Sequence, residues 1–415
     1  MSGTIHIIGA GLAGLSAAVR LTALGRKVVV HEATAFAGGR CRSYHDASVG
    51  MTIDNGNHLL LSGNHAALDY LRSIGADQRL VGPPSAEFNF ADLVSGERWT
   101  LRFNDGPIPF WVFDPARRVP GTRVLDYLPL ARLLWAPAGK AVGEVIACQG
   151  TLYQRLVEPL IVAALNIDAP DGSARLAGAI VRETLAVGGR ACRPLIAREG
   201  LGTTLIEPAL AHLQARSAAV RMEHQLRSLR FAAERIEALD FCAETIVLGV
   251  DDAVILAVPP YIAASLVPGL DVPTEFRAIV NAHFRIEPPA AQPPILGVLN
   301  GTVQWLFAFP GRLSVTISAG DRLIDAPREE LAKTIWGEVA RLTGLPPEMP
   351  PWQIVRERRA TFAATPAQDA RRPGASTKWR NLVLAGDWTE TGLPATIEGA
   401  IRSGNRAADT VAKQS

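Results

Sequence analysis

The chain lacks an excess of charge of either sign, and it lacks the residue spacings that mark metal or disulfide proteins. Its 415 residues include 42 basic and 40 acidic side chains, a net charge of +2, so charge gives no reason to expect a nucleic-acid partner. The four cysteines stand far apart, and the eight histidines show no metal-ligand spacing. We therefore expect no bound metal, no disulfide framework and a reducing compartment.

Long hydrophobic runs are also missing. No stretch of about 18 uninterrupted apolar residues occurs, so the sequence predicts no membrane-spanning helix. The apolar start, Met1–Val19, has no Lys or Arg before its apolar run and is interrupted by three glycines. This pattern is more typical of a glycine-rich turn after a strand than of a signal peptide. We expect a cytoplasmic protein.

The order of elements predicts an α/β protein, and its length predicts two intertwined domains. A strand at Thr4–Ile8, a helix at Leu12–Leu24 and a strand at Lys27–His31 form an opening βαβ unit. Helical stretches broken by prolines are expected from about Leu59 to Ala197. The most convincing of them are Leu125–Ala136 and Leu152–Leu165.

The second half of the chain alternates between predicted helices and strands. Helices are expected at Gly202–Leu213, Arg328–Thr343 and Thr396–Val411, and strands at Ala219–Met222, Gln225–Phe231, Arg235–Leu239, Thr245–Leu248, Val254–Val258, Ile279–Ile286, Trp305–Phe309, Leu313–Ser318 and Leu382–Ala385. We assign residues 1–60, 200–265 and 375–415 to a discontinuous cofactor domain. Residues 61–199 and 266–374 form the interleaved substrate domain, with a mixed sheet and a helical cap.

The first motif with chemistry is a glycine-rich turn, Gly9-Ala10-Gly11-Leu12-Ala13-Gly14. It follows a strand and opens a helix, whose free N–H groups and positive dipole suit a pyrophosphate. Gly9 permits the tight turn, Gly11 lets the backbone approach the phosphates, and Gly14 allows close helix packing. Glu32, 21 residues after Gly11 and followed by Ala33, offers a carboxylate to the ribose hydroxyls. The pattern predicts a bound dinucleotide without distinguishing FAD from NAD.

Further segments resemble the cofactor motifs of flavin amine oxidases and carotenoid desaturases. Gly38-Gly39-Arg40 is similar to the segment whose glycines pass the pyrophosphate and whose arginine contacts the cofactor. Asn55-Gly56-Asn57-His58, directly after Asp54, is similar to the segment at the flavin edge. Leu382–Trp388, a buried strand that ends in Gly386-Asp387, and the helix start at Thr396-Ile397-Glu398 are similar to the carboxy-terminal piece.

The resemblance implies non-covalently bound FAD in a Rossmann-like domain of the amine oxidase and phytoene desaturase type. Asp387 would hold the ribityl–phosphate end. The backbone at Ile397 and Glu398 would face the pyrimidine edge of the flavin, where a helix N-terminus stabilises the negative charge of the reduced ring. The segment Val220–Leu229 looks like the strand pair that clasps adenine, with Leu226 at the contact.

Across almost the whole chain the sequence resembles the hydroxysqualene dehydroxylase family of squalene and hopanoid synthesis. The resemblance is carried by Asp54–Ser62 (DNGNHLLLS), Glu158–Arg175 (EPLIVAALNIDAPDGSAR) and Gly386–Gly399 (GDWTETGLPATIEG). Amine oxidases commonly place an aromatic residue where this chain has Thr396, and a lysine where it has Asn281. These departures argue against an amine substrate.

The resemblance implies an enzyme that removes an allylic hydroxyl from hydroxysqualene reductively, giving squalene. A polyprenoid desaturase and a flavin-fold carrier of isoprenoid lipid are the alternatives. The candidate donors to the leaving hydroxyl are Asp54, His58, Asn166 and Glu398, which the sequence does not rank.

The implied partners are an isoprenoid lipid substrate and an electron donor or reductase for the flavin. The leucine-rich stretches Val124–Ala136 and Leu152–Leu165 are either ordinary core or the wall of a lipid channel, with aromatic residues nearby at Trp111, Phe113 and Trp135. Four arginines border this region and form either a solvated face or a peripheral contact with an anionic bilayer: Arg117, Arg118, Arg123 and Arg132.

Overall fold

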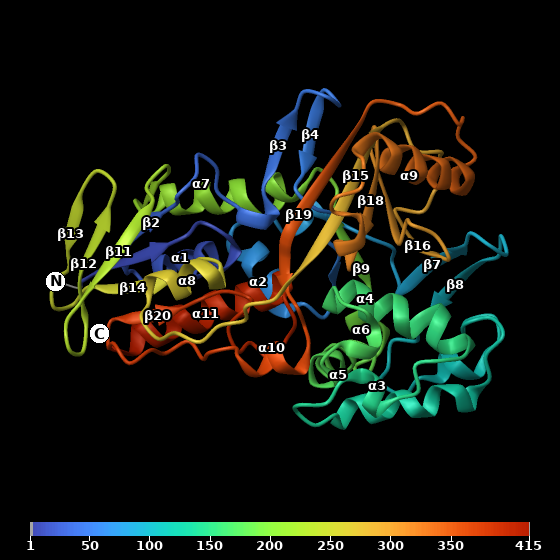
Figure 1. Cartoon of the computed structure of the whole chain (residues 1–415), viewed down its shortest axis with the longest axis horizontal. Helices are drawn as coiled ribbons and strands as arrows, with labels where there is room; N and C mark the ends of the chain where they lie inside the picture. The colour runs from blue at the N-terminus through green and yellow to red at the C-terminus, as the bar shows by residue number, and fades with distance from the viewer. Residues whose placement is uncertain (1–2, 415) are drawn as a thin grey trace.

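The computed structural model describes residues 3–414 and shows an elongated molecule built on two β-sheets (Figure 1). A parallel sheet lies at the end of the molecule that carries both chain termini, and a larger mixed sheet with a helical cap lies at the other end. No helix described between residues 3 and 414 is long and apolar enough to cross a bilayer.

The parallel sheet joins strands from distant parts of the chain, in the order β10-β2-β1-β14-β20. β1 (Thr4–Ile8) pairs with β2 (Lys27–His31) on one side and with β14 (Ala253–Leu256) on the other. β10 (Ala219–Arg221) extends the sheet beyond β2, and β20 (Leu382–Leu384) extends it beyond β14. Because the strands are parallel, their carboxyl ends and the loops that follow them meet at one edge.

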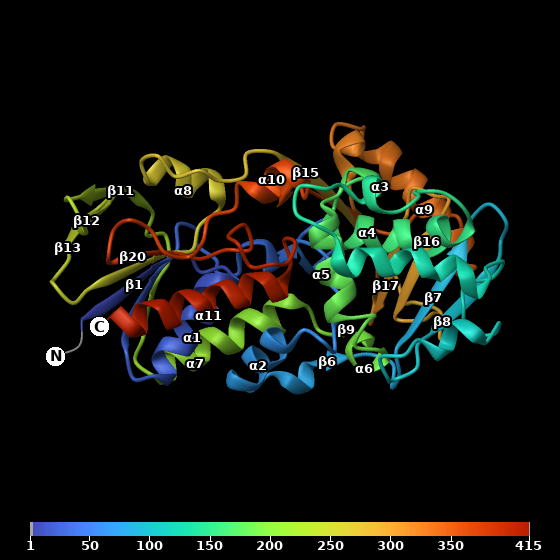
Figure 2. The ribbon, with the colours of Figure 1, turned by 90° about the horizontal axis from the view of Figure 1, so that it is seen from below.

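Helices α1 (Leu12–Ala23), α7 (Glu207–Ala215) and α11 (Ile397–Gln414) lie along one side of this sheet (Figure 2). Small residues bring α1 and α11 into contact, because a Cβ atom on Gly404 would lie 2.1 Å from the carbonyl oxygen of Ala13. The other side carries an antiparallel sheet and a helix: β11 (Leu226–Phe231), β12 (Ile236–Phe241), β13 (Thr245–Val247) and α8 (Pro260–Leu266).

The second sheet has the order β19-β15-β18-β17-β16-β7-β8, and α9 (Arg328–Thr343) packs on one face of it. Its strands are β7 (Glu87–Asp92), β8 (Arg98–Arg102), β15 (Phe276–Arg285), β16 (Ile295–Leu299), β17 (Trp305–Phe309), β18 (Arg312–Ile317) and β19 (Trp352–Phe362). β7 and β8 correct the prediction of helical stretches broken by prolines from Leu59 to Ala197, which included no strand. β7 pairs with β16, about two hundred residues later in the chain, and no local pattern contains that partner.

A helical cap covers the opposite side of the second sheet. It comprises η3 (Phe110–Phe113), η4 (Val124–Trp135), α3 (Val142–Val145), η5 (Tyr153–Val157), α4 (Glu158–Leu165), η6 (Ala169–Asp171), α5 (Ala174–Glu183) and α6 (Gly189–Cys192). Shorter elements complete the chain: η1 (Gly39–Cys41), β3 (Ser43–Asp46), β4 (Met51–Asp54), β5 (Leu60–Leu61), α2 (His65–Ser73), η2 (Asp77–Arg79), β6 (Leu80–Val81), β9 (Pro194–Ala197), η7 (Gly202–Ile206), η8 (Gly320–Leu323) and α10 (Pro366–Ala370).

Several segments predicted as helices contain prolines, and the structure shows 3-10 or π-helical geometry in them. The stretch expected at Leu125–Ala136 is the 3-10 helix η4, which contains Pro129. The stretch expected at Leu152–Leu165 begins as the π-helical turn η5 and becomes α-helical at Glu158. Pro159 explains the wide turn, because its ring has no N–H and clashes with the carbonyl four residues earlier. Pro208 follows the π-helical turn η7 in the same way.

Candidate functional site

The loops after β1, β14 and β20 meet at the carboxyl edge of the parallel sheet. The amide of Ala257 donates to the carbonyl of Ile8 at 2.8 Å, and the amide of Ala385 donates to the carbonyl of Leu256 at 3.0 Å. A Cβ atom on Gly9, whose φ is +105°, would lie only 2.4 Å from the carbonyl oxygen of Ala257. The Gly9–Gly14 turn and the Gly386-Asp387 strand end therefore lie at the same edge of one sheet.

The glycine turn leaves an open concavity in front of α1. A Cβ atom on Gly14 would lie 1.9 Å from the carbonyl oxygen of Gly9, so this glycine is needed for the helix to pack. A Cβ atom on Gly11 would meet nothing within 4 Å, and one on Gly39 would meet only the Cα atom of Gly11. The first turn of α1 has no side-chain cap and no acidic residue. Free amides and open backbone fit a pyrophosphate at this position.

The acidic residue at the end of β2 points back toward the glycine turn. The Oε2 atom of Glu32 accepts the Ala10 amide at 2.8 Å, and its Oε1 atom accepts the Thr34 amide at 2.9 Å. The backbone of the β10–β11 turn lies against this strand end, since the His224 amide donates to the Glu32 carbonyl at 2.7 Å. Leu226 opens β11 close by and is buried. The expected strand pair is divided, because β10 joins the parallel sheet and β11 joins the antiparallel one.

An ion pair joins two of the predicted cofactor motifs. Arg40 Nη2 donates to both carboxylate oxygens of Asp387 at 2.7 Å, and Arg40 Nη1 donates to the Ala360 carbonyl at 2.5 Å. Asp387 is buried, whereas 43% of the Arg40 side chain stays exposed and free to meet a ligand. The surrounding protein partly desolvates the guanidinium, which opposes its charge, but the ion pair and hydrogen bond with Asp387 outweigh this effect and the pKa of Arg40 is raised. Arg40 therefore remains a cation at the carboxyl edge of the parallel sheet.

Three of the four candidate proton donors are occupied by contacts inside the protein. Asp54 accepts the Leu201 amide at 2.8 Å and the Ser43 hydroxyl at 2.5 Å, and it pairs with Arg312 at 3.4 Å, so both of its oxygens already have partners inside the protein. Glu398 accepts the amides of Ala66 and Ala67 at 3.1 and 2.8 Å and thereby caps α2. It also pairs with Arg402 at 2.7 Å. These contacts favour structural roles for Asp54 and Glu398.

Asn166 connects the cap to the second sheet. It ends α4 in the left-handed conformation, and its Oδ1 atom accepts the Ala319 amide at 2.7 Å. Its Nδ2 atom donates to the Arg277 carbonyl at 3.3 Å and to Thr361 Oγ1 at 3.0 Å. Both the oxygen and the nitrogen of the side-chain amide already make hydrogen bonds within the protein. This favours a positioning role for Asn166 over proton donation.

His58 is the candidate donor whose ring makes no hydrogen bond to any residue between 3 and 414. A Cβ atom on Gly56 would lie 3.4 Å from His58 Nε2 and 3.5 Å from Asn281 Nδ2, so both polar groups face this glycine. Burial and, secondarily, Arg40 lower the pKa of His58 to about 4. At neutral pH the imidazole is uncharged, and it can still donate one hydrogen bond.

A polar row on β15 and β18 lies beside His58, where the amine oxidase resemblance would place a lysine. Thr316 Oγ1 donates to Asn281 Oδ1 at 2.8 Å, and Asn57 Nδ2 donates to Thr316 Oγ1 at 3.1 Å. The Oδ1 atom of Asn57 is buried and accepts no hydrogen bond from the described residues. A buried acceptor without a partner fits a ligand with polar hydrogens, such as a flavin ring. Thr396 lies at the start of α11, where its Oγ1 accepts the Gly399 amide at 3.0 Å.

A buried ion cluster holds the Gly386–Thr391 turn, and no local sequence pattern predicts it. Arg372 donates to the carbonyls of Asp387 and Thr389 at 3.0 Å and to Asp369 Oδ1 at 3.2 Å. Asp369 also accepts from Arg175 at 2.8 Å. The cluster therefore ties α5, in the substrate region, to the last cofactor motif.

A chain of three histidines connects β1, β2 and the turn between β10 and β11. His6 Nδ1 lies 3.1 Å from His31 Nε2, and His31 Nδ1 lies 2.9 Å from His224 Nδ1. Beyond it, His224 Nε2 lies 3.0 Å from the Glu244 carboxylate. Burial, followed by the neighbouring His6, His224 and Arg221, lowers the pKa of His31 to about 3. The three residues are so far apart in sequence that no local spacing reveals the chain.

We expect acid to destabilise the fold through these histidines. A histidine whose pKa is lower in the folded than in the unfolded protein binds fewer protons when folded, so its contribution to stability is lost as the pH falls below 6.5. For His31, and for His283, whose pKa burial also lowers to about 3, the loss is about 1.4 kcal/mol per pH unit. Urea unfolding at pH 7 and pH 5 measures it. His31→Gln should reduce the difference in free energy of unfolding between the two pH values, whereas His45→Gln, at an exposed position, should not. Equal stability of the wild-type protein at both pH values would contradict the prediction.

Comparison with known proteins defines first the class and then the family. Residues 12–412 match the family described as flavin containing amine oxidoreductase, so the chain is a flavin-dependent oxidoreductase and the predicted fold class is confirmed. A hydroxysqualene dehydroxylase of Rhodopseudomonas palustris is 63% identical over 412 residues, 99% of each chain. One of Sinorhizobium fredii is 61% identical over 409 residues, 99% of this chain and 98% of its own. The chain belongs to the hydroxysqualene dehydroxylase family, as the sequence predicts.

The fold is shared more widely. Cyclohexylamine oxidase of Brevibacterium oxydans superposes with a TM-score of 0.71 at 15% sequence identity, covering 100% of this chain and 99% of that chain. At this identity the likeness concerns the fold alone, because site chemistry differs among proteins of one fold.

Proposed function

We propose that the protein binds FAD non-covalently and uses it to remove the hydroxyl group of hydroxysqualene, giving squalene. The observation that carries the proposal is the 63% identity over 412 residues with a protein of that name, because it extends through the substrate region as well as the cofactor motifs. We propose the domain division stated above, and a cytoplasmic protein that works at the inner face of the plasma membrane with an electron donor or reductase.

The residues around the carboxyl edge of the parallel sheet fit FAD. We propose that the Gly9–Gly14 turn and Gly38-Gly39-Arg40 hold the pyrophosphate, that Glu32 and Ala33 hold the ribose, and that the strand around Leu226 contacts adenine. Asp387 and the segments 55–58 and 396–398 would border the ribityl chain and the flavin ring. The open backbone at Gly11 and the free acceptor of Asn57 support this placement.

The cysteine nearest to the cofactor loop supports non-covalent binding. Cys41 is 6% exposed, and burial raises the pKa of its thiol to about 12. A covalent bond to flavin requires the thiolate, which is scarce at neutral pH for such a group. Denaturing the purified protein in acid should therefore release all the flavin into the supernatant.

Reduced FAD, when bound, supplies the hydride that replaces the hydroxyl group. Overall, the carbon–oxygen bond breaks, the oxygen takes up a proton and leaves as water, and a carbon–hydrogen bond forms at the same carbon. The hydride and the proton together equal the two hydrogens that FADH2 gives up when it becomes FAD. We propose that the neutral imidazole of His58 donates a hydrogen bond to the leaving oxygen, since its ring is free of protein partners. Asn281 holds the polar end of the site beside it through Thr316 and Asn57.

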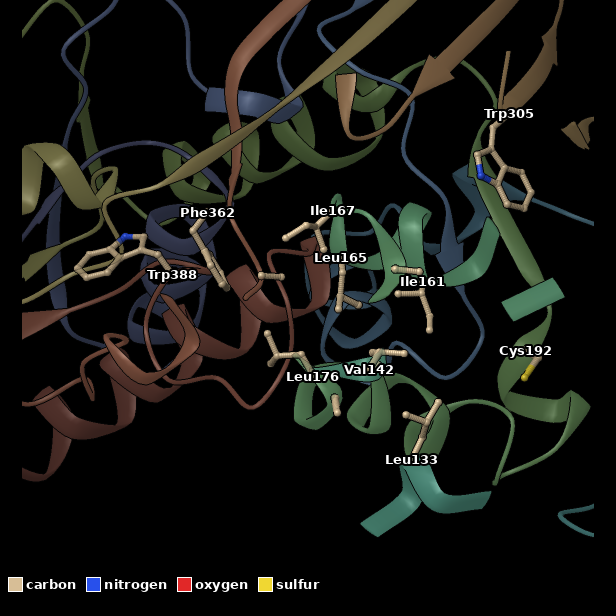
Figure 3. Packing of buried hydrophobic residues seen from close by; sticks show 14 of the residues in the cluster. Leu133, Val142, Ile161, Leu165, Ile167, Leu176, Cys192, Trp305, Phe362 and Trp388 are labelled. Carbon is tan, nitrogen blue, oxygen red and sulfur yellow. The ribbon is translucent and has the colours of Figure 1, made fainter. Parts of the chain in front are cut away.

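Buried apolar side chains exclude water from the reacting carbon. One continuous hydrophobic cluster extends from Trp388 and Phe362, next to the cofactor motifs, through Ile167 and Leu165 to Leu133 in the cap (Figure 3). We propose that the isoprenoid chain lies along this cluster. A dry, apolar surround strengthens the polar contacts made at the leaving oxygen.

Product analysis tests the proposal. The holoprotein, incubated anaerobically with hydroxysqualene and reduced FAD, should form squalene, identified by chromatography against a standard. New conjugated double bonds formed from squalene under oxidising conditions would instead establish a desaturase. A colourless protein that takes up no FAD would establish the carrier alternative.

Removing the imidazole of His58 should slow the reaction. We expect His58→Ala to lower kcat by about tenfold, the worth of one lost hydrogen bond, with the flavin content unchanged. His58→Gln, which keeps an N–H donor, should recover part of the rate. The matched control is His65→Ala, at the exposed start of α2. Full activity of His58→Ala would show that His58 does not donate a hydrogen bond that the reaction needs.

A further inference from the structure

Exposed hydrophobic side chains gather in one segment of the cap. Among residues 3–414, the large apolar side chains that remain exposed are concentrated between residues 108 and 135. Six lie there: Ile108, Phe110, Phe113, Leu125, Leu128 and Trp135, with exposed fractions of 58% to 78%. Exposed apolar residues are ordinary when scattered, but a cluster of this size marks an interaction surface. We call these six side chains the apolar surface.

The 3-10 helix η4 presents apolar residues on two sides. With three residues per turn, positions three apart lie above one another. Val124, Tyr127 and Leu130 pack against the hydrophobic cluster, and Leu133 is buried within it. One position further along, Leu125 and Leu128 are 72% and 64% exposed. A helix that is apolar toward both the core and the outside needs a second apolar medium.

The two halves of the apolar surface stand on one packed unit. Trp111 of η3 is buried and meets Tyr127 of η4 edge to face, with ring centroids 5.2 Å apart. The Tyr127 hydroxyl accepts the Val119 amide at 3.1 Å. Phe110 and Phe113, which flank Trp111 in η3, are therefore held beside η4 and not on an independent loop.

Arginines without an ionic partner share this part of the cap. Arg117, Arg118, Arg123 and Arg132 lie within the segment 108–135, Arg182 contacts it, and none of the five makes an ion pair with any described residue. Arg182 Nη1 donates to the Leu134 carbonyl at 2.8 Å, which fixes it beside η4. The segment between residues 108 and 135 contains two acidic side chains, Asp114 and Asp126. They accept backbone amides at 2.9 and 2.7 Å. The surface is therefore apolar with a basic border.

We propose that this surface docks on an anionic bilayer, with the six apolar side chains inserted among the lipids and the arginines at the headgroups. This inference deepens the proposed function, because a thirty-carbon substrate resides in membranes and Leu133 connects the docked helix to the buried cluster (Figure 3). A symmetric dimer through the same surface would bring like-charged arginines face to face, which disfavours a second copy as the occupant.

Trp135 provides a direct probe of the inserted depth. It is 78% exposed, whereas six of the other seven tryptophans are at most 8% exposed. We expect the holoenzyme to co-sediment with vesicles of phosphatidylglycerol and phosphatidylcholine in equal parts, and brominated lipid tails to quench its fluorescence. Trp135→Leu keeps the apolar character, so it should bind equally well and lose most of the quenching.

Matched variants separate the contribution of the apolar side chains to vesicle binding from that of the arginines. Leu125→Ser combined with Leu128→Ser and Trp135→Ser should weaken vesicle binding by about a hundredfold, with the flavin spectrum unchanged. Arg123→Gln combined with Arg132→Gln should weaken it by about tenfold at low ionic strength and little at high ionic strength. Val247→Ser combined with Val250→Ser, at exposed positions near β13, is the control and should change nothing.

Three outcomes would overturn the inference: no binding to anionic vesicles at low ionic strength, unchanged binding of the triple serine variant, or a dimer in sedimentation velocity that the same variant abolishes. Squalene formation from substrate in detergent micelles is measured in parallel with the wild-type protein. Activity in micelles without vesicle binding would reject the membrane surface and leave the proposed function intact. Vesicle binding without activity in micelles would reject the proposed function alone.

Discussion

Gly11→Ala should yield a folded protein that has lost its flavin. The φ of Gly11 is −75°, which any residue adopts, and its new Cβ atom would meet nothing within 4 Å of the protein. If FAD lies where we propose, the same methyl group meets the pyrophosphate. Overpacking of this kind costs up to about 3 kcal/mol, so we expect FAD affinity to fall by about a hundredfold. Circular dichroism of the apoprotein and titration with FAD measure the two effects separately.

Two other glycines are the controls for this experiment. Gly14→Ala places its Cβ atom 1.9 Å from the carbonyl oxygen of Gly9, so it should disturb the turn and lower the stability of the apoprotein itself. Gly337→Ala lies on the exposed side of α9 with open space around it and should raise stability by about 0.5–1 kcal/mol without affecting the flavin. Undiminished FAD binding by Gly11→Ala would show that the pyrophosphate lies elsewhere.

Arg372→Met should destabilise the protein more than any surface substitution. The guanidinium of Arg372 is fully buried and holds two carbonyls of the Gly386–Thr391 turn as well as Asp369. Removing it leaves Asp369 paired with Arg175 alone and deprives the carbonyls of Asp387 and Thr389 of their donor, and an unsatisfied buried acceptor costs about 1–3 kcal/mol. Urea unfolding of the apoprotein gives the loss directly.

The adjacent residue offers a matched control. Arg371 pairs with Asp271 at 2.6 Å on the surface, where the two side chains are 38% and 63% exposed. Exposed ion pairs contribute about 0–1 kcal/mol, so Arg371→Met should hardly change the free energy of unfolding. Because Arg372 also fixes the backbone of Asp387, its loss should weaken FAD binding, while Arg371→Met should not. Equal effects of the two substitutions would show that the buried cluster carries no special stability.

Local sequence patterns predicted several elements in both halves of the molecule well. β1, β2, β17 and α9 have the predicted bounds, since each is a periodic apolar segment ended by glycine, proline or a polar turn. The glycine turn and Glu32 were also evident, because pyrophosphate binding requires those residue types at a fixed spacing along the chain.

Other elements were predicted less well, for reasons found in single residues. Pro159 and Pro208 convert the ends of regular helices into π-helical turns, which apolar periodicity does not reveal. β19 carries Arg356, Arg358 and Arg359 within a strand, and its place at the edge of the sheet tolerates these charges. β7 depends on its distant partner β16.

The sequence by itself determined the family, the flavin and the fold class, because these depend on short motifs whose residue types are dictated by contact with the cofactor. Only the tertiary structure decided what the individual polar residues do. It shows that Asp54, Asn166 and Glu398 bind other parts of the protein, and that His58 remains free. It also assembles the Asp369–Arg372 cluster, the histidine chain and the apolar surface. The reason is physical: burial and hydrogen-bond partners come from residues far apart in the chain, and a sequence pattern contains neither.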